Sequence, residues 1–471
     1  MPHRWKVLTL VSLGVFMVSL DLFIVNVAFP SIERDFHGSS VSSVSWVLNA
    51  YAIVVAALMV SAGRFADRHG RKRLFQLGML IFVIGSALCG AAWSVPTLVV
   101  ARVIQGSGAA LMLPTSLALL LPEFSPAERP AAIGIWAAIG GVAAAFGPPI
   151  GGLLVHISWR LVFFVNLPVG IGALLYGTRL LHESRDQRQE RPDLLGSALI
   201  AAAIGLLALG LVEAPTWGWG NARTIAVLAA SVVGVGAFWA RCLTHPSPVI
   251  DPAIVRVRSF ALANLSSIIF SAAFSAFLLS NVLLLTGVWH ESIVIAGLQL
   301  APGPATAATV AAISSRHLNR FGQRTFATIG ITLFGLGALW WRLRIGAAPD
   351  YAGEMLPGQF ITGSGVGFVL PSLASASASS LPPARFATGS GVYAMTRQIG
   401  FAIGISVLIA VLGRPDRVDP VRPFDRGYLF MMIACSLAAL AALAIGPIRA
   451  GAAHVDAAVA SPAPPLAGAA G

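Results

Sequence analysis

Long apolar stretches are the feature of this sequence that most constrains its fold. About twenty mostly apolar residues suffice to cross the hydrocarbon core of a bilayer as a helix. The 471-residue sequence contains fourteen such stretches, separated by short polar segments: 8–30, 45–65, 74–93, 96–120, 131–156, 160–181, 194–213, 222–240, 260–285, 292–313, 325–341, 353–378, 387–412 and 427–447. A soluble chain could not keep so much apolar surface from water. The sequence therefore predicts an all-α integral membrane protein with fourteen transmembrane helices.

The charged residues exclude several classes of function. They make up 11% of the chain and give a net charge of +12. Nucleic-acid binding would need a basic face on a folded domain, and no segment outside the apolar stretches is long enough to form one. No phosphate-binding P-loop occurs, so ATP is not expected to drive the protein. No cofactor and no nucleic-acid partner are expected.

Cysteine and histidine are sparse, which bears on metal sites and on catalysis. Cys89, Cys242 and Cys435 lie far apart in apolar sequence, and histidines such as His182 are scattered near the ends of the predicted spans. This distribution predicts neither a disulfide framework nor a metal site. A lipid-modifying membrane enzyme is disfavoured as well, because such an enzyme usually needs an acidic metal-binding cluster or a His/Cys constellation.

The distribution of basic residues predicts the orientation. With the N-terminus in the cytoplasm, twenty Lys and Arg residues fall in cytoplasmic segments and nine in external ones, while Arg102 and Arg397 lie inside spans. Cytoplasmic loops of membrane proteins carry such an excess. An even number of spans then places both termini in the cytoplasm, in a multi-pass protein of the cell membrane. The Ala/Pro/Gly-rich tail 450–471 is predicted to be disordered.

A weak internal repeat divides the chain. The segment Gly63-Arg-Phe-Ala-Asp67-Arg68-His-Gly70-Arg71-Lys72 follows the second span, and Asn319-Arg320-Phe-Gly322-Gln-Arg324 follows the tenth as a degraded copy. Duplicated transporter halves leave such echoes. The spans are therefore expected in a 6 + 2 + 6 arrangement: an N-terminal six-helix bundle (1–190), an inserted two-helix pair (191–245) and a C-terminal six-helix bundle (246–449).

Five motifs in chain order resemble the major facilitator superfamily, and within it the fourteen-span drug/proton antiporters. They are Leu20-Asp21-Leu-Phe23-Ile-Val-Asn26-Val-Ala-Phe-Pro30, the Gly63–Lys72 segment, Arg102-Val-Ile-Gln105-Gly106, Gly147-Pro148-Pro149-Ile-Gly151-Gly152, and Trp159-Arg160-Leu-Val-Phe163-Phe164-Val-Asn166-Leu-Pro168. Phe23 stands where the family usually has threonine. The resemblance implies a major facilitator fold and a monomer that uses the proton gradient. It also implies export of small hydrophobic or amphipathic compounds, such as drugs and antibiotics, by alternating access.

Asp21 and Arg102 are the candidate proton-coupling residues. An acid roughly halfway through a span is costly to bury, so a functional role is the default interpretation. The two residues lie at similar depths in spans one and four, which makes pairing possible. Two alternatives stay open for Asp21: a fixed structural ion pair, and a carboxylate facing a water-filled vestibule. Arg102 could organise water and backbone near the proton site or touch substrate.

Two segments are candidate gating elements. The resemblance places Asp67 near the inner start of span thirteen, around Arg385 to Thr388, where a carboxylate could satisfy free N–H groups of a helix start and latch the two halves together. The same segment, with Gly63, Arg68, Gly70, Arg71 and Lys72, could instead only fix the topology. Gly147, Pro148, Gly151 and Gly152 are expected to break or kink span five and to form a seal or hinge, or simply to allow close packing.

The remaining candidates are aromatic or polar residues that could line a substrate cavity. They are Phe23, Asn26, Trp46, Tyr51, Gln105, Trp136, Asn281, Gln299 and Arg397. Any one of them, taken singly, more often packs than binds a ligand. Because the other acids near spans lie at span ends, neutral, monocationic and anionic substrates all fit. A proton-coupled symporter, an exporter of one specific metabolite and a non-transporting sensor or scaffold remain as alternatives.

Overall fold

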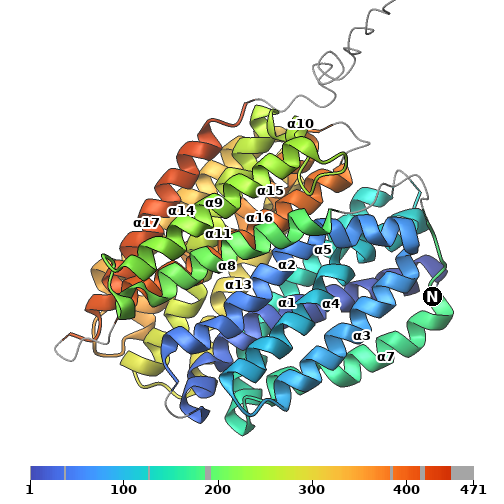
Figure 1. The fold of residues 1–471 in the computed structure, drawn as a ribbon. Coiled ribbons are helices and arrows are strands. Elements are labelled where there is room, and N and C mark those ends of the chain that lie inside the picture. Colours follow the sequence, from blue (N-terminus) through green and yellow to red (C-terminus); the bar gives the residue numbers. More distant parts are fainter. Residues whose placement is uncertain are drawn as a thin grey trace, which may run out of the picture.

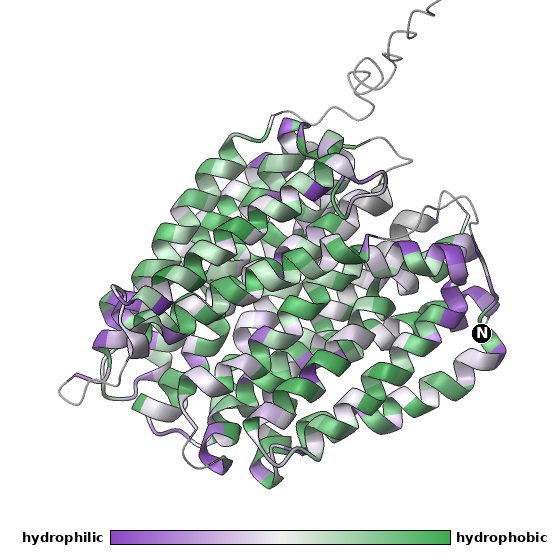
Figure 2. Cartoon of the chain, viewed as in Figure 1, coloured by the Kyte–Doolittle hydropathy of each residue, from purple (hydrophilic) through white to green (hydrophobic). Residues whose placement is uncertain are grey.

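The computed structural model describes residues 2–36, 39–125, 128–185, 193–381, 386–413 and 419–446, and within these ranges every regular element is helical. Thirteen helices are long and apolar enough to cross a membrane, and a shorter apolar stretch, Val142–Ile157, lies in one further helix. Each of the fourteen predicted spans coincides with one helix or with two consecutive ones. Hydrophobic residues dominate the length of the helices and hydrophilic ones gather at their ends (Figure 2). The tail 450–471 lies outside the described residues.

The first part of the chain forms one group of helices (Figure 1). Its elements are α1 (His3–Asp35), α2 (Val41–His69), α3 (Arg71–Gly90), α4 (Val95–Leu120), the short turn η1 (Leu121–Glu123), α5 (Arg129–Ile157), α6 (Leu161–Phe164) and α7 (Asn166–Leu180). Helix α4 packs against α2 and α3, α5 packs against α1, and α7 covers α3. The predicted sixth span is therefore two helices, α6 and α7.

The last part forms a second group. It contains α10 (Pro252–Val255), α11 (Arg258–Leu283), the π-helical turn η2 (Leu284–Val288), α12 (Ile293–Leu300), α13 (Pro302–Phe321), α14 (Gln323–Arg344), the π-helical turn η3 (Tyr351–Met355), α15 (Leu356–Ser379), α16 (Phe386–Leu412) and α17 (Arg422–Leu443). Its core is aromatic: Phe274 packs edge-on against Phe334 and Phe401, and Phe277 stacks on Trp341 with 5.2 Å between ring centroids.

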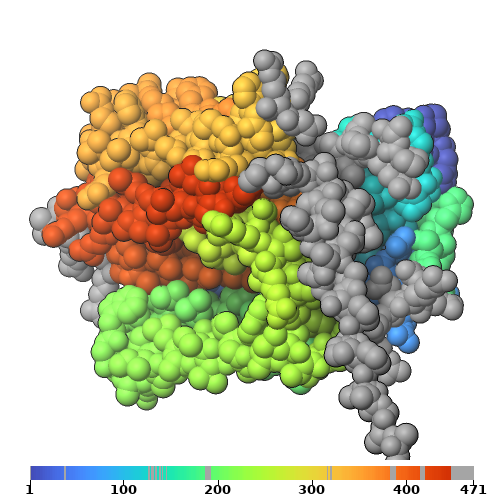
Figure 3. All heavy atoms as spheres, turned by 90° about the horizontal axis from the view of Figure 1, so that it is seen from above, coloured from blue at the N-terminus to red at the C-terminus, as the bar shows by residue number. Residues whose placement is uncertain are grey.

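The two groups meet along two seams. Helix α2 packs against α16, and α5 packs against α12 and α13. A buried hydrogen bond crosses the first seam, from Asn49 Nδ2 to Ser406 Oγ at 3.2 Å. Seen from above, the blue and cyan part of the chain lies on one side and the orange and red part on the other (Figure 3).

The inserted pair, α8 (Leu194–Trp217) and α9 (Ala222–Thr244), is fastened to both groups. Helix α8 packs against α9, α2 and α16, and Ser61 and Ser197 share a buried hydrogen bond of 2.7 Å. Asp193 caps α8 through the Gly196 N–H (2.8 Å) and accepts a hydrogen bond from Arg241 at the end of α9 (2.7 Å). Burial alone would raise the pKa of Asp193, but these hydrogen bonds hold it below its usual value. The carboxylate therefore stays charged and joins the two helices.

The internal repeat is present in the backbone. Helices α2 and α3 are separated by Gly70 alone, with φ +125°, and α13 and α14 are separated by Gly322 alone, with φ +83°. Side-chain-bearing residues rarely adopt these backbone conformations. The degraded copy at 319–324 has thus kept the helix–glycine–helix turn, although Asn319 and Gln323 stand where the first segment has the charged Asp67 and Arg71.

Gly322→Ala should therefore destabilise the protein by about 1 to 3 kcal/mol, the usual cost of such a backbone conformation. A Cβ atom at this position meets nothing within 4 Å, so the loss would come from the backbone alone. Thermal unfolding of the purified protein measures it. Gly172→Ala, inside α7 and equally open, is the control and should leave the unfolding temperature unchanged or higher. Equal unfolding temperatures for the two variants would contradict the expectation.

Candidate functional site

Asp21 lies in the middle of α1 and is completely buried. Both of its carboxylate oxygens are occupied. Oδ2 accepts a hydrogen bond from Arg102 NH1 on α4 at 2.5 Å, and Oδ1 accepts one from Gln105 Nε2 at 2.8 Å. Residues 102 and 105 are one helical turn apart, so both side chains point from α4 toward the same spot on α1. The two helices are joined at this depth by an ion pair and an amide.

Arg102 is held in place from several sides. Its Nε donates to the Val47 carbonyl at 3.0 Å, its NH1 also donates to Gln105 Oε1 at 2.6 Å, and the guanidinium lies 4.0 Å from the centre of the Tyr51 ring. Both Arg102 and Tyr51 are fully buried. Since an isolated charge here would carry a large desolvation penalty, the carboxylate, the amide oxygen and the ring face together compensate for the loss of water.

A further layer of polar residues orients Gln105. Its Nε2 also donates to Ser86 Oγ at 3.3 Å, Ser86 in turn donates to the Phe163 carbonyl at 2.8 Å, and Asn166 Nδ2 donates to Ser86 at 3.1 Å. Ser86, Phe163 and Asn166 were not among the site residues predicted from the sequence. Phe163 and Asn166 belong to the motif at the start of the sixth span, which was a usable signal, whereas Ser86 is one serine among apolar residues of α3 and gave none.

The predicted cavity residues do not form one group. Tyr51 and Gln105 belong to the Asp21 cluster and have no solvent exposure. Elsewhere, Asn26 donates to the Leu22 carbonyl of its own helix, Trp136 donates to Ser116 Oγ, and Gln299 donates to Glu291 Oε1. Phe23 packs under Gly147, while Trp46 and Arg397 are half-buried. Asn281 is buried with neither amide atom paired.

The Gly63–Lys72 segment forms the turn between α2 and α3, and the carboxylate of Glu183 caps the start of α3. Glu183, just beyond α7, accepts hydrogen bonds from the backbone N–H groups of Lys72 (3.1 Å) and Arg73 (3.2 Å). Lys72 Nζ returns a hydrogen bond to the Thr178 carbonyl of α7 at 2.7 Å. A negative charge at the start of α3 satisfies N–H groups that have no helical partner. Glu183 was not among the candidates, because only the fold brings it here.

Within the same segment, Asp67 near the end of α2 binds Arg71 at the start of α3. Its Oδ1 accepts a hydrogen bond from Arg71 Nε at 2.7 Å. Arg64 NH1 reaches the carbonyls of Ser247 and Pro248, in the connection between α9 and α10, at 3.1 and 2.7 Å. The predicted partner of Asp67, the helix start around Arg385 to Thr388, lies outside the residues whose side chains the structure describes.

The sequence predicted that the segment would break or kink span five. Helix α5 continues through Pro148 and Pro149, so the break does not occur, and the kink stays a prediction. Neighbouring helices can compensate for hydrogen bonds that proline removes inside a membrane. Gly147 faces α1, where a Cβ atom would lie 2.6 Å from Cβ of Phe23. Gly152 faces α12, where a Cβ atom would lie 2.7 Å from the Ile293 carbonyl oxygen. These glycines let α5 pack closely against α1 of its own group and against α12 of the other, as small residues do at helix contacts in membranes.

Comparison with known proteins identifies the family. The family model described as "Major Facilitator Superfamily" matches residues 11–405. The chain belongs to the major facilitator superfamily. It is a membrane transporter rather than an enzyme. This agrees with the resemblance that the five motifs indicated.

Several known proteins are similar in sequence to this chain over most of their length. The tetracenomycin C resistance and export protein of Streptomyces glaucescens is 33% identical, covering 89% of this chain and 77% of that protein. The multidrug resistance protein Stp of Mycobacterium tuberculosis is 35% identical, covering 87% and 76%. The cephamycin export protein CmcT of Amycolatopsis lactamdurans is 31% identical, covering 91% and 89%.

Solved structures share the fold at low identity. A D-xylose–proton symporter matches with a TM-score of 0.68 at 13% identity, covering 95% of this chain and 99% of that one. The human organic anion transporter MFSD10 matches with a TM-score of 0.64 at 15% identity, covering 95% and 100%. At these identities the likeness establishes the architecture of the helices and nothing about substrate.

Replacing Arg102 by glutamine should leave the Asp21 carboxylate buried without its countercharge. Breaking a buried pair in this way typically costs about 3 to 5 kcal/mol. We expect a clear drop in the thermal unfolding temperature of the purified Arg102→Gln variant. Adding Asp21→Asn should recover most of the loss, since no charge is then left unpaired. Arg223→Gln, at an exposed position of α9, is the matched control; an Arg102 variant as stable as this control would contradict the argument.

Replacing Glu183 by alanine should expose the start of α3. Loss of a helix cap costs about 0.5 to 2 kcal/mol. Glu183→Gln keeps one carbonyl oxygen as acceptor and should lie between the wild type and Glu183→Ala. Hydrogen exchange of the Lys72 and Arg73 amides tests this directly, because they should exchange faster in the alanine variant. Unchanged exchange at these two amides would show that Glu183 does not act as the cap.

Proposed function

We propose that the protein exports small hydrophobic or amphipathic compounds, including drugs and antibiotics, out of the cell in exchange for protons. The observation that carries the proposal is the buried cluster of Asp21, Arg102 and Gln105. Burying a carboxylate and a guanidinium away from water costs free energy. Their presence therefore favours a role beyond stability. The similar proteins support the direction of transport, because they are named for resistance and export.

The cluster offers a physical route from proton binding to movement. Protonation of Asp21 would remove the negative charge that compensates Arg102, and Arg102 would then be a buried cation without a countercharge. That state favours any arrangement of α1, α2 and α4 that gives Arg102 other acceptors or water. A proton thereby shifts the equilibrium between two conformations through its different free energy in each of them. Substrate binding to the opposite conformation completes an exchange cycle.

The proposed arrangement in the membrane follows from the sequence. All fourteen spans cross the bilayer as 6 + 2 + 6, with both termini in the cytoplasm and the chain embedded in the cell membrane as a working monomer. The proton gradient is the energy source and no cofactor takes part. The Gly63–Lys72 turn then lies on the cytoplasmic side, where Asp67 could exchange its bond with Arg71 for the start of α16. The packed glycines of α5 act as the seal between the halves.

The range of substrates is open in one respect. Two of the similar proteins carry the name of a single compound, tetracenomycin C or cephamycin, which favours export of one specific metabolite as the second candidate. The lack of a second acid deep in a span fits neutral, singly charged or anionic compounds. Symport with protons is an alternative, since a solved structure of the same fold is a proton symporter. The glycine–proline segment of α5 resembles that of antiporters and favours exchange of substrate for protons.

Replacing Asp21 by asparagine should abolish proton-driven export, because asparagine resembles the protonated carboxyl group in shape but cannot release a proton. Loss of the charge facing Arg102 should lower the unfolding temperature, while the variant still folds in membranes. Inverted membrane vesicles with an imposed pH gradient measure uptake of a dye or antibiotic that the wild type transports. Asp35→Asn, at the exposed end of the same helix, should transport normally. Gradient-independent exchange of substrate should persist in Asp21→Asn, which separates coupling from misfolding. Accumulation of substrate by Asp21→Asn against a pH gradient would show the coupling role to be wrong.

A further inference from the structure

We propose that His3, Glu123 and His182 form a binding site for one zinc-type divalent cation. The three residues come from the first turn of α1, from η1 after α4, and from the segment directly after α7. Their ligand atoms all lie within 4.8 Å of one another. This site is separate from the Asp21 cluster, and its test does not depend on the proposed function. The sequence predicted no metal site, because the cysteines lie far apart and the histidines are scattered near the ends of the predicted spans.

The chemistry of the three side chains suits zinc. Two imidazole nitrogens and one carboxylate oxygen form a ligand set that zinc uses with water in the fourth position. Imidazole also selects against magnesium and calcium, which prefer oxygen ligands alone. The cation would be bound by one negatively charged carboxylate and two neutral imidazoles. Any proton on these ligand atoms would be released when the cation binds.

The distances allow closure on an ion with small movements. His3 Nε2 lies 3.7 Å from Glu123 Oε2, and the rings of His3 and His182 are 5.0 Å apart between centroids. Tetrahedral zinc with ligands at about 2.1 Å separates its ligand atoms by about 3.4 Å. The widest pair would therefore have to approach by no more than about 1.4 Å, which rotation of exposed side chains can supply.

The backbone positions of the three ligands are fixed by contacts that do not involve the ion. Arg4, next to His3, binds both oxygens of Glu128 at 2.8 and 3.1 Å. Trp5 packs edge-on against Phe124, next to Glu123, with 5.6 Å between ring centroids. Preorganised ligands of this kind lose less freedom when an ion binds.

His182 is fixed in the same way. It lies between Leu181, which is buried, and Glu183, which caps α3. The side chain itself is exposed, as is that of His3, so the site is open to an ion from solution.

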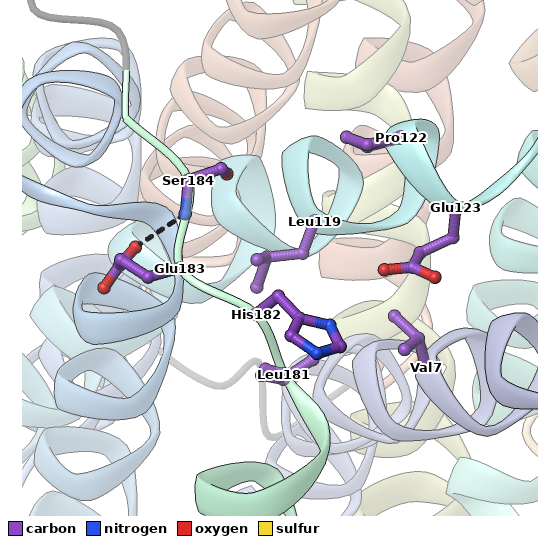
Figure 4. A pocket seen from close by; sticks show the side chains of 8 residues that line it. All are labelled: Val7, Leu119, Pro122, Glu123, Leu181, His182, Glu183 and Ser184. Carbon is purple, nitrogen blue, oxygen red and sulfur yellow. Dashed lines mark hydrogen bonds between the residues drawn. The ribbon is translucent and has the colours of Figure 1, made fainter.

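A small pocket borders two of the three proposed ligands, Glu123 and His182, while His3 lies outside its lining. In Figure 4 the Glu123 carboxylate and the His182 ring extend into the same space, with apolar side chains around them. The three free cysteines, in contrast, are buried and cannot take up an ion from solution.

Zinc titration of the full-length protein, purified without a polyhistidine tag and stripped with a chelator, tests the site. We expect one zinc ion per chain by isothermal titration calorimetry, and an X-ray absorption spectrum with nitrogen and oxygen neighbours and no sulfur. Zinc should also raise the thermal unfolding temperature, because it binds the folded state. His3→Ala and His182→Ala should each weaken binding by about 100-fold or more, since even partners of metal ligands matter by about 10- to 100-fold.

His156→Ala is the matched control, because His156 is exposed and belongs to another part of the molecule. It should bind zinc as the wild type does. Glu123→Gln should weaken binding and remove the zinc-dependent rise in unfolding temperature, while unfolding without metal stays near that of the wild type. Absence of stoichiometric binding by the wild type, or equal affinities in the wild type, His3→Ala and His182→Ala, would overturn the proposal. Sulfur neighbours in the absorption spectrum would overturn it too.

Discussion

The relative positions of the N-terminal helices depend on the ion pair between Asp21 and Arg102. A carboxylate in the middle of α1 must find a positive charge and donors at its own depth, because water is absent there. Arg102 supplies the charge and Gln105 the second donor, and both belong to α4. To hold Arg102, α2 must present a carbonyl and an aromatic ring at that level. One buried charge thereby sets the relative height of three helices.

The contacts between the two groups of helices are of a different kind. The seam between α5 and α12 is made by glycines in close approach to backbone, and the seam between α2 and α16 includes one amide–hydroxyl hydrogen bond. Surfaces of this type can slide or separate at modest cost, which is what a transporter of this superfamily needs between its halves. The buried ion pair of Asp21 and Arg102 lies within the N-terminal group, where it can respond to a proton without holding the halves together.

Much of the fold could be predicted from the sequence, because each helix is a long apolar stretch whose position is set by composition alone. The helix–glycine–helix turns at Gly70 and Gly322 were also predictable from the repeat. The pairing of Asp21 with Arg102 could be expected from depth, since distance along a helix fixes height. The remaining partners could not: Ser86 gains its role only when α3 packs beside α4, and Glu183 only when α7 packs beside α3. The unbroken course of α5 through two prolines is likewise decided by its neighbours, not by proline itself.

The proximity of His3 and His182 is another feature that could not be predicted from their spacing in the sequence. His3 and His182 are separated by almost the whole N-terminal group of helices in sequence, and each looks like a solitary residue at a span end. An even number of spans between two chain positions returns both to the same side of the bundle, so residues at such ends are brought together by topology. His3, Glu123 and His182 satisfy this condition, being the ends of spans one, four and six on the side of the N-terminus. Polar residues at equivalent span ends therefore deserve comparison with one another, even where their spacing in the sequence suggests no site.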